Sequence, residues 1–69
     1  MRNKIGKRIK EIRLENKLSQ YEFGKLLSVS QDTISLWETG KSLPSTEILI
    51  LMAEHFKLSV DYILCLTEY

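Results

Sequence analysis

Apolar residues recur along the first part of the chain at the spacing of an amphipathic helix. Ile5, Ile9 and Ile12 follow one another at intervals of four and three residues, with lysines and arginines between them. This spacing puts the three isoleucines on one face of a helix over about residues 3–16. No segment alternates apolar and polar residues over the length of a strand. The sequence therefore predicts an all-α fold.

Serines mark the predicted starts of four further helices. Ser19 and Glu22 fit a capping box, in which each side chain accepts a hydrogen bond from the backbone N–H of the other residue. The expected helices cover about residues 20–28, 30–38, 46–56 and 60–66. Residues 39–44 form the longest loop, and Pro44 lacks the N–H that a helix interior needs. Five short helices are therefore expected.

The same pattern predicts which side of each helix faces the core. Helix 46–56 is apolar on nearly every side, which is typical of a helix in the middle of a bundle. The inward positions expected on the two helices before it are Phe23, Leu26, Leu27, Ile34 and Trp37.

The short connection between the second and third helices suggests how they pack. Residues 28–30 are too few for an antiparallel pair, so the two helices must cross steeply, as in a helix-turn-helix. Gly24 lies inside the second helix, where glycine costs about 1 kcal/mol relative to alanine. Either a close approach of the next helix requires it, or it is merely tolerated. We expect the helix-turn-helix unit to cover about residues 19–38.

Length and composition limit the possible functions. The 69 residues suit a single domain over 1–69, and the longest apolar run, 48–53, is far shorter than the roughly 20 residues of a membrane helix. No secretory signal is recognisable, so a cytoplasmic location is expected. One cysteine and one histidine provide neither a disulfide nor a metal cluster. No catalytic constellation or phosphate loop is present either, so we expect no enzyme activity, no cofactor and no metal.

Charge is distributed unevenly along the chain. Residues 1–17 carry a net charge of +5 and residues 18–69 a net charge of −4. Such polarity suggests either one face that attracts an anionic polymer or a solvated amphipathic helix.

Several segments together carry a family resemblance. They are LSQ at 18–20, LLSVSQDTISLWETGK at 26–41, LP at 43–44 and LSVDYIL at 58–64. In these segments the chain resembles the lambda-repressor/Cro-like helix-turn-helix family, also called the XRE type. The resemblance implies a five-helix DNA-binding domain whose helices 2 and 3 form the helix-turn-helix, and most often a dimeric transcriptional repressor.

In a helix-turn-helix the second helix lies in the major groove. With Ile34 and Trp37 turned inward, the residues expected to face the bases are Gln31, Asp32, Ser35 and Leu36. Gln31 suits adenine and Asp32 suits a cytosine amino group. Leu36 departs from the polar or basic residue usual in the family, and is expected either to pack on a thymine methyl or to extend the core or a protein interface.

Phosphate contacts would fix the register of the protein on the duplex. Gln20, at a helix start, resembles the phosphate-clamping glutamine of the family. The other phosphate candidates are Ser30, Thr39, Lys41 and Thr33, of which Thr33 is also a candidate for base contact. The resemblance also implies an ion pair between Arg13 and Glu38. Ser28 stands where the family commonly has glycine, and would be strained if its backbone were left-handed.

These observations predict a sequence-specific regulator of transcription, most simply a repressor that binds a pseudo-palindromic operator as a homodimer. Its expected partner is double-stranded DNA, with no membrane and no evident small-molecule effector. The candidate dimer interface is Tyr62, Cys65, Leu66 and Tyr69. The alternative is a protein-interaction module or antitoxin on the same fold, with weak or no DNA binding of its own.

Overall fold

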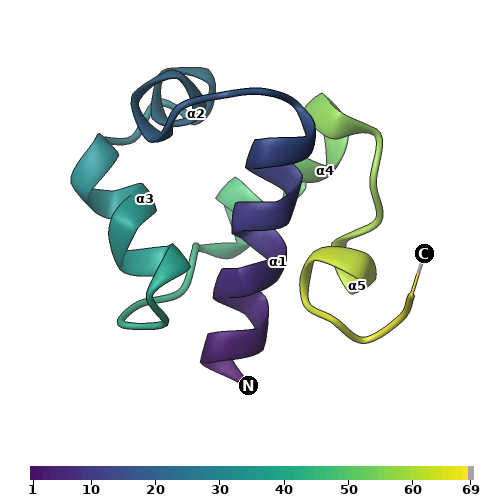
Figure 1. Cartoon of the computed structure of the whole chain (residues 1–69). Coiled ribbons are helices and arrows are strands. Elements are labelled where there is room, and N and C mark those ends of the chain that lie inside the picture. Colours follow the sequence, from purple (N-terminus) through teal and green to yellow (C-terminus); the bar gives the residue numbers. More distant parts are fainter. Residues whose placement is uncertain (69) are drawn as a thin grey trace.

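The computed structural model describes residues 1–68, which form five α-helices and no strand (Figure 1). The prediction of an all-α fold is confirmed. The first four helices begin and end within one residue of the predicted positions. The helices are α1 (Arg2–Glu15), α2 (Gln20–Leu27), α3 (Gln31–Glu38), α4 (Thr46–Phe56) and α5 (Val60–Ile63).

A serine hydroxyl caps the start of each helix after α1. In each case the side chain accepts a hydrogen bond from the backbone N–H three residues later, which satisfies one of the free donors of the first turn. At α2 the capping box is complete, because the N–H of Ser19 also donates to Glu22 Oε1 at 2.9 Å. This hydrogen bond lowers the pKa of Glu22 below its ordinary value of 4.5. The four capping residues are Ser19, Ser30, Ser45 and Ser59.

The predicted end of the fifth helix near residue 66 is wrong, because α5 ends at Ile63. The chain reverses at Cys65, whose backbone is left-handed with φ 63°. The N–H of Leu66 then donates back to Asp61 O at 2.8 Å and closes the helix end. Cys65 therefore lies in a turn and not on a helix as predicted.

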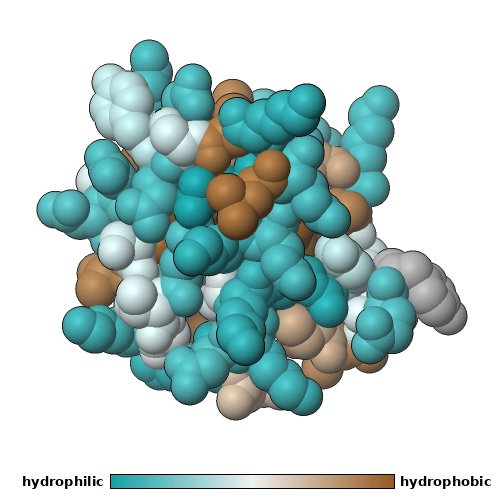
Figure 2. Space-filling view, in the orientation of Figure 1, coloured by the Kyte–Doolittle hydropathy of each residue, from teal (hydrophilic) through white to brown (hydrophobic). Residues whose placement is uncertain are grey.

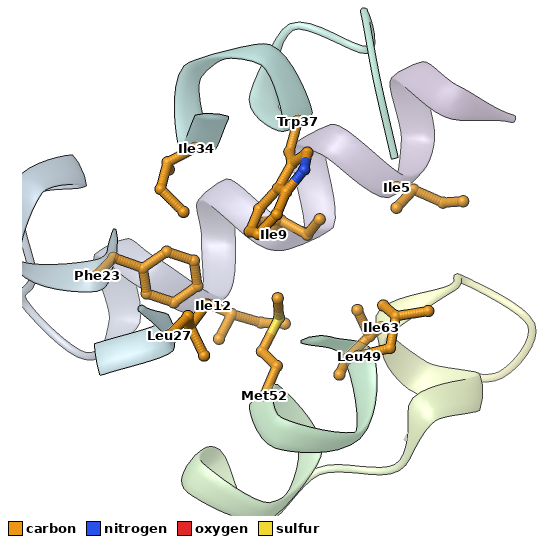
Figure 3. Packing of buried hydrophobic residues seen from close by; sticks show 10 residues of the cluster. All are labelled: Ile5, Ile9, Ile12, Phe23, Leu27, Ile34, Trp37, Leu49, Met52 and Ile63. Carbon is orange, nitrogen blue, oxygen red and sulfur yellow. The ribbon is translucent and has the colours of Figure 1, made fainter. Parts of the chain in front are cut away.

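The core lies where all five helices meet (Figure 3). Phe23 of α2 stacks on Phe56 of α4 with ring centroids 5.6 Å apart, which fastens these two helices together. Leu26 was expected to face inward, but its side chain is 39% exposed. Phe23 and Leu27 already fill the inward face of this two-turn helix. The buried apolar residues are Ile5, Ile9, Ile12, Phe23, Leu27, Ile34, Trp37, Leu49, Met52 and Ile63.

The central position predicted for helix 46–56 is also wrong. In α4 only Leu49 and Met52 are buried, while Ile50 is 48% exposed. The helix that lies between the others is α1, which packs against α3 on one side and α5 on the other (Figure 1). A chain of this length has too few helices to surround an apolar one, so part of α4 stays at the surface.

Arg8 fastens the short α5 to α1. Its guanidinium lies over the ring of Tyr62, 4.0 Å from the centroid, and donates a hydrogen bond to the carbonyl oxygen of Tyr62. It also pairs with Glu11 at 3.4 Å. A cation over an aromatic ring adds to the apolar contact that Ile63 makes with the core. Among the described residues no helix has the length and apolar character that crossing a membrane would need.

Candidate nucleic-acid interface

The turn between α2 and α3 has the left-handed backbone that would strain a serine. Ser28 adopts φ 60° and ψ 38°, a conformation that glycine enters at less cost. The N–H of the next residue, Val29, donates to Gly24 O at 2.9 Å and closes the end of α2. The chain then enters α3 through the cap at Ser30, which produces the predicted helix-turn-helix geometry.

Two glycines allow close contacts behind α3. A Cβ atom on Gly24 would lie 2.6 Å from Val29 O, so the absence of a side chain is required there. The predicted close backbone approach is present, but it comes from the turn before α3 and not from α3 itself. A Cβ atom on Gly6 of α1 would lie 2.5 Å from Trp37 O. Sequence analysis missed Gly6, although its place inside a predicted helix is the same signal that singled out Gly24. Gly6 thus lets the end of α3 lie close to α1, and Gly24 lets the turn before α3 lie close to α2.

The outer face of α3 presents most of the residues predicted to read bases. Gln31, Asp32 and Leu36 are exposed, and Ser35 is half-buried. Ile34 and Trp37 occupy the opposite face of α3, where they are 0% and 4% exposed. The helix thus has an apolar back anchored in the core and a polar front with one leucine.

The predicted ion pair between Arg13 and Glu38 is present and nearly buried. Arg13 Nε donates to Glu38 Oε2 at 2.6 Å and Nη2 donates to Oε1 at 3.2 Å, which is the paired geometry that suits a guanidinium and a carboxylate. The remaining Nη1 donates to Leu18 O at 2.9 Å. The pair therefore joins the end of α1 to the end of α3.

The candidate phosphate contacts differ in how much of their hydrogen-bonding capacity is free. Gln20 Nε2 donates to Glu38 Oε1 at 3.1 Å, so this amide belongs to the Arg13–Glu38 network. The Thr39 hydroxyl donates to Ser35 O at 2.9 Å and leaves no proton for a phosphate oxygen. The hydroxyls of Ser30 and Thr33 share one hydrogen bond of 2.9 Å. Lys41 is exposed beside the end of α3.

The cations of α1 do not act as one field. Arg13 is neutralised by Glu38, and Arg8 is held between Tyr62 and Glu11. Lys4 and Lys7 line a surface pocket of about 260 Å³ on the α5 side. Figure 2 shows that the face crossed by α1 is covered mainly by hydrophilic residues, with small separate apolar patches. Arg8 contributes to the positive charge of residues 1–17, but its contacts are structural.

The residues predicted for a dimer interface lie at and after α5. Leu66 is 63% exposed, whereas Tyr62 and Cys65 are half-buried against α1. Tyr69 lies outside the described residues. Arg8 is a further residue that sequence analysis missed in this region, because a cation over an aromatic ring 54 positions later leaves no local signal.

Comparison with protein families identifies residues 9–63 with the model described as helix-turn-helix. Among characterised proteins, the chain is 36% identical to antitoxin PezA of Streptococcus pneumoniae over 80% of this chain and 35% of that protein. It is 35% identical to repressor protein C2 of Salmonella phage P22 over 87% of this chain and 28% of that protein. The chain thus spans about a third of the length of the curated relatives it matches.

The fold also matches a solved structure. The P22 c2 repressor in complex with a synthetic operator superimposes with a TM-score of 0.79 and 34% identity, over 86% of this chain and 89% of that chain.

Proposed function

The chain belongs to the lambda-repressor-like helix-turn-helix family, and on that basis we propose that it binds double-stranded DNA through α3 and regulates transcription. The observation that carries the proposal is the two-sided character of α3. Its back is buried through Ile34 and Trp37, while Gln31, Asp32 and Leu36 project to solvent. A helix of this diameter fits the major groove, where base edges carry the sequence information.

The base-reading residues we propose are Gln31, Asp32, Ser35 and Leu36. Gln31 in the first turn suits the paired donor and acceptor of adenine, and Asp32 accepts from the amino group of cytosine. For phosphate contacts we propose Gln20, Ser30, Thr33 and Lys41. Of these, exposed Lys41 and the N-terminal turn of α2 at Gln20 offer the most favourable electrostatics. Thr39 is left out because its hydroxyl and its backbone N–H both donate to Ser35 O.

Two copies would be needed to reach useful specificity. Eight residues of α3 can read only about four or five base pairs, so we propose a two-fold dimer on a pseudo-palindromic operator. Exposed Leu66, with Tyr62, Cys65 and Tyr69, is the proposed contact between the subunits. Occupancy of the operator would exclude other proteins from the promoter, which makes repression the proposed mode of action.

Operator selection followed by titration tests this function. Duplexes selected from a random library are titrated with the protein at two salt concentrations. Gln31→Ala is expected to cost about 1–3 kcal/mol of discrimination at one base pair. Lys41→Ala should weaken all duplexes alike and reduce the salt slope by about one. The matched control is Lys4→Ala, because Lys4 lies on the α5 side of α1.

A protein-interaction module is the second candidate, favoured by the 36% identity to an antitoxin. Under that function, exposed Leu36 and Asp32 would contact a protein partner. Folded protein that binds no duplex selectively, in wild type and in both variants, would support this candidate and contradict the first.

A further inference from the structure

The exposed face of α3 carries no positive charge. The helix has the sequence QDTISLWE, and its two ionisable side chains are Asp32 and Glu38. Glu38 is bound by Arg13, so Asp32 is the charge that α3 presents outward. Guanine is read most often by an arginine or lysine that donates to O6 and N7. This helix provides no such group and offers an acceptor instead.

Leu36 is held at the surface by the structure around it. Leu36 lies in the second turn of α3 and is 43% exposed. Its carbonyl oxygen accepts from Lys41 N at 2.9 Å and from Ser42 N at 3.3 Å, so the backbone cannot rotate freely. Ile34 and Trp37 fill the core side, which leaves Leu36 no inward site. Leu36 is therefore an exposed apolar side chain on a restrained backbone.

Leu36 also follows Asp32 by four residues. Side chains at this spacing are neighbours on one helix face. A ligand that touches both must combine a hydrogen-bond donor with an apolar group. On the major-groove edges of DNA, the amino donors are cytosine N4 and adenine N6, and the apolar group is the C5-methyl of thymine. A carboxylate favours cytosine, because adenine N7, beside N6, is an acceptor that repels it. The two groups that suit Asp32 and Leu36 therefore belong to pyrimidines.

From this we propose that Leu36 forms a subsite for the C5-methyl group of a pyrimidine, next to a cytosine read by Asp32. The inference rests on the DNA binding proposed above and specifies its chemistry. 5-Methylcytosine carries the same methyl group as thymine, so methylation of a cytosine at this position strengthens binding. The protein thus distinguishes methylated from unmethylated pyrimidines at one position of each half-site.

Uracil substitution isolates the methyl group, because uracil differs from thymine only at C5. In the selected operator, each thymine of a half-site is replaced in turn by uracil, and the dissociation constant is measured at fixed salt. We expect one position at which the loss of one buried methyl weakens binding about fourfold. Leu36→Ala should bind both duplexes equally at that position. Ile50→Ala, which truncates a similarly exposed residue on α4, should keep the wild-type difference.

A second comparison separates the methyl group from the identity of the base pair. The sensitive thymine–adenine pair is replaced by cytosine–guanine, with or without a methyl group on the cytosine. We expect the methylated duplex to bind about fourfold more tightly in the wild type and equally in Leu36→Ala. Circular dichroism checks that each variant is folded.

The possible outcomes distinguish this proposal from the function on which it depends. Selective binding without any uracil-sensitive position, or with a sensitivity that survives in Leu36→Ala, overturns the methyl subsite and leaves DNA binding intact. A selected operator that contains no thymine also overturns the methyl subsite and leaves DNA binding intact. Folded wild-type protein that selects no operator overturns both.

Discussion

Arg13 and Glu38 lie 25 residues apart in the sequence and meet through two hydrogen bonds of 2.6 and 3.2 Å. Their side chains are only 10% and 5% exposed. The pair lies behind α3, and Gln20 adds a third hydrogen bond to the same carboxylate. The orientation of the proposed reading helix therefore depends on a nearly buried charge pair, which makes the pair the first target for mutation.

Glu38→Ala is expected to lower the free energy of unfolding by about 3 kcal/mol, because it leaves the Arg13 guanidinium buried without its counter-charge. Urea unfolding followed by circular dichroism measures the change. The double variant Arg13→Met with Glu38→Leu should recover most of the loss, since it removes both charges together. If Glu38→Ala unfolds at the wild-type urea concentration, the pair does not support the fold as argued.

Gly24→Ala is expected to destabilise the protein by about 1–3 kcal/mol, because the added Cβ would lie 2.6 Å from Val29 O. This loss outweighs the gain of about 1 kcal/mol that alanine brings to a helix interior. Gly6→Ala should act in the same direction for the same reason. Glu54→Ala at an exposed helical position serves as the control and should change stability little. A stabilised Gly24→Ala protein would refute the close contact.

Ser28→Gly is expected to stabilise the protein by up to about 1 kcal/mol, because residue 28 has φ 60°. Part of the gain is lost to the larger entropy of glycine in the unfolded chain. Lys57→Gly, at φ 56°, should shift stability in the same direction. Lys25→Gly, inside α2, should do the opposite by about 1 kcal/mol. Equal effects of all three glycines on urea unfolding would show that backbone strain is not the cause.

The capping box at Ser19 and Glu22 predicts that the free energy of unfolding decreases at acidic pH. Because the N–H of Ser19 lowers the pKa of Glu22 in the folded state, the folded protein holds this proton less tightly than the unfolded chain does. Its contribution to stability is therefore complete above about pH 4.5, the ordinary value, and disappears as the pH falls through the lowered pKa. Glu22→Gln keeps the box without a titrating group.

Urea unfolding at a series of pH values from neutral to strongly acidic tests this dependence. The wild type should lose more stability than Glu22→Gln as the medium is acidified. Parallel curves for the two proteins would mean that Glu22 makes no acid-dependent contribution.

The helix starts could be predicted because their cause is local. A serine before each helix after α1 supplies the hydrogen-bond acceptor that the first turn needs, whatever the rest of the fold does. The end of α5 could not be predicted in this way. This helix end depends on the left-handed backbone of Cys65. The thiol of Cys65 contacts Lys4 O in α1, 61 residues earlier in the sequence. The spacing of apolar residues along the sequence does not predict such a contact.

For the candidate site, the sequence predicts which residues of α3 are exposed, but not all of the hydrogen bonds around them. Once Ile34 and Trp37 are assigned to the core, the helical period alone turns Gln31, Asp32 and Leu36 outward, and the structure has them exposed. The hydrogen bond of Gln20 could not be predicted, because its partner Glu38 lies 18 residues later in the sequence. The hydrogen bond of Thr39 is local, to the carbonyl oxygen four residues earlier, and sequence analysis overlooked it.

The brevity of α3 has a consequence for measurement. A helix of eight residues is too short to persist in isolation, where about 12–15 are needed. The proposed reading surface therefore disappears in the same cooperative transition as the rest of the molecule. A ligand that binds only the folded protein raises the melting temperature of the protein, and the increase grows with the ligand concentration. Heating the protein with increasing amounts of duplex would thus report affinity without any label on either partner.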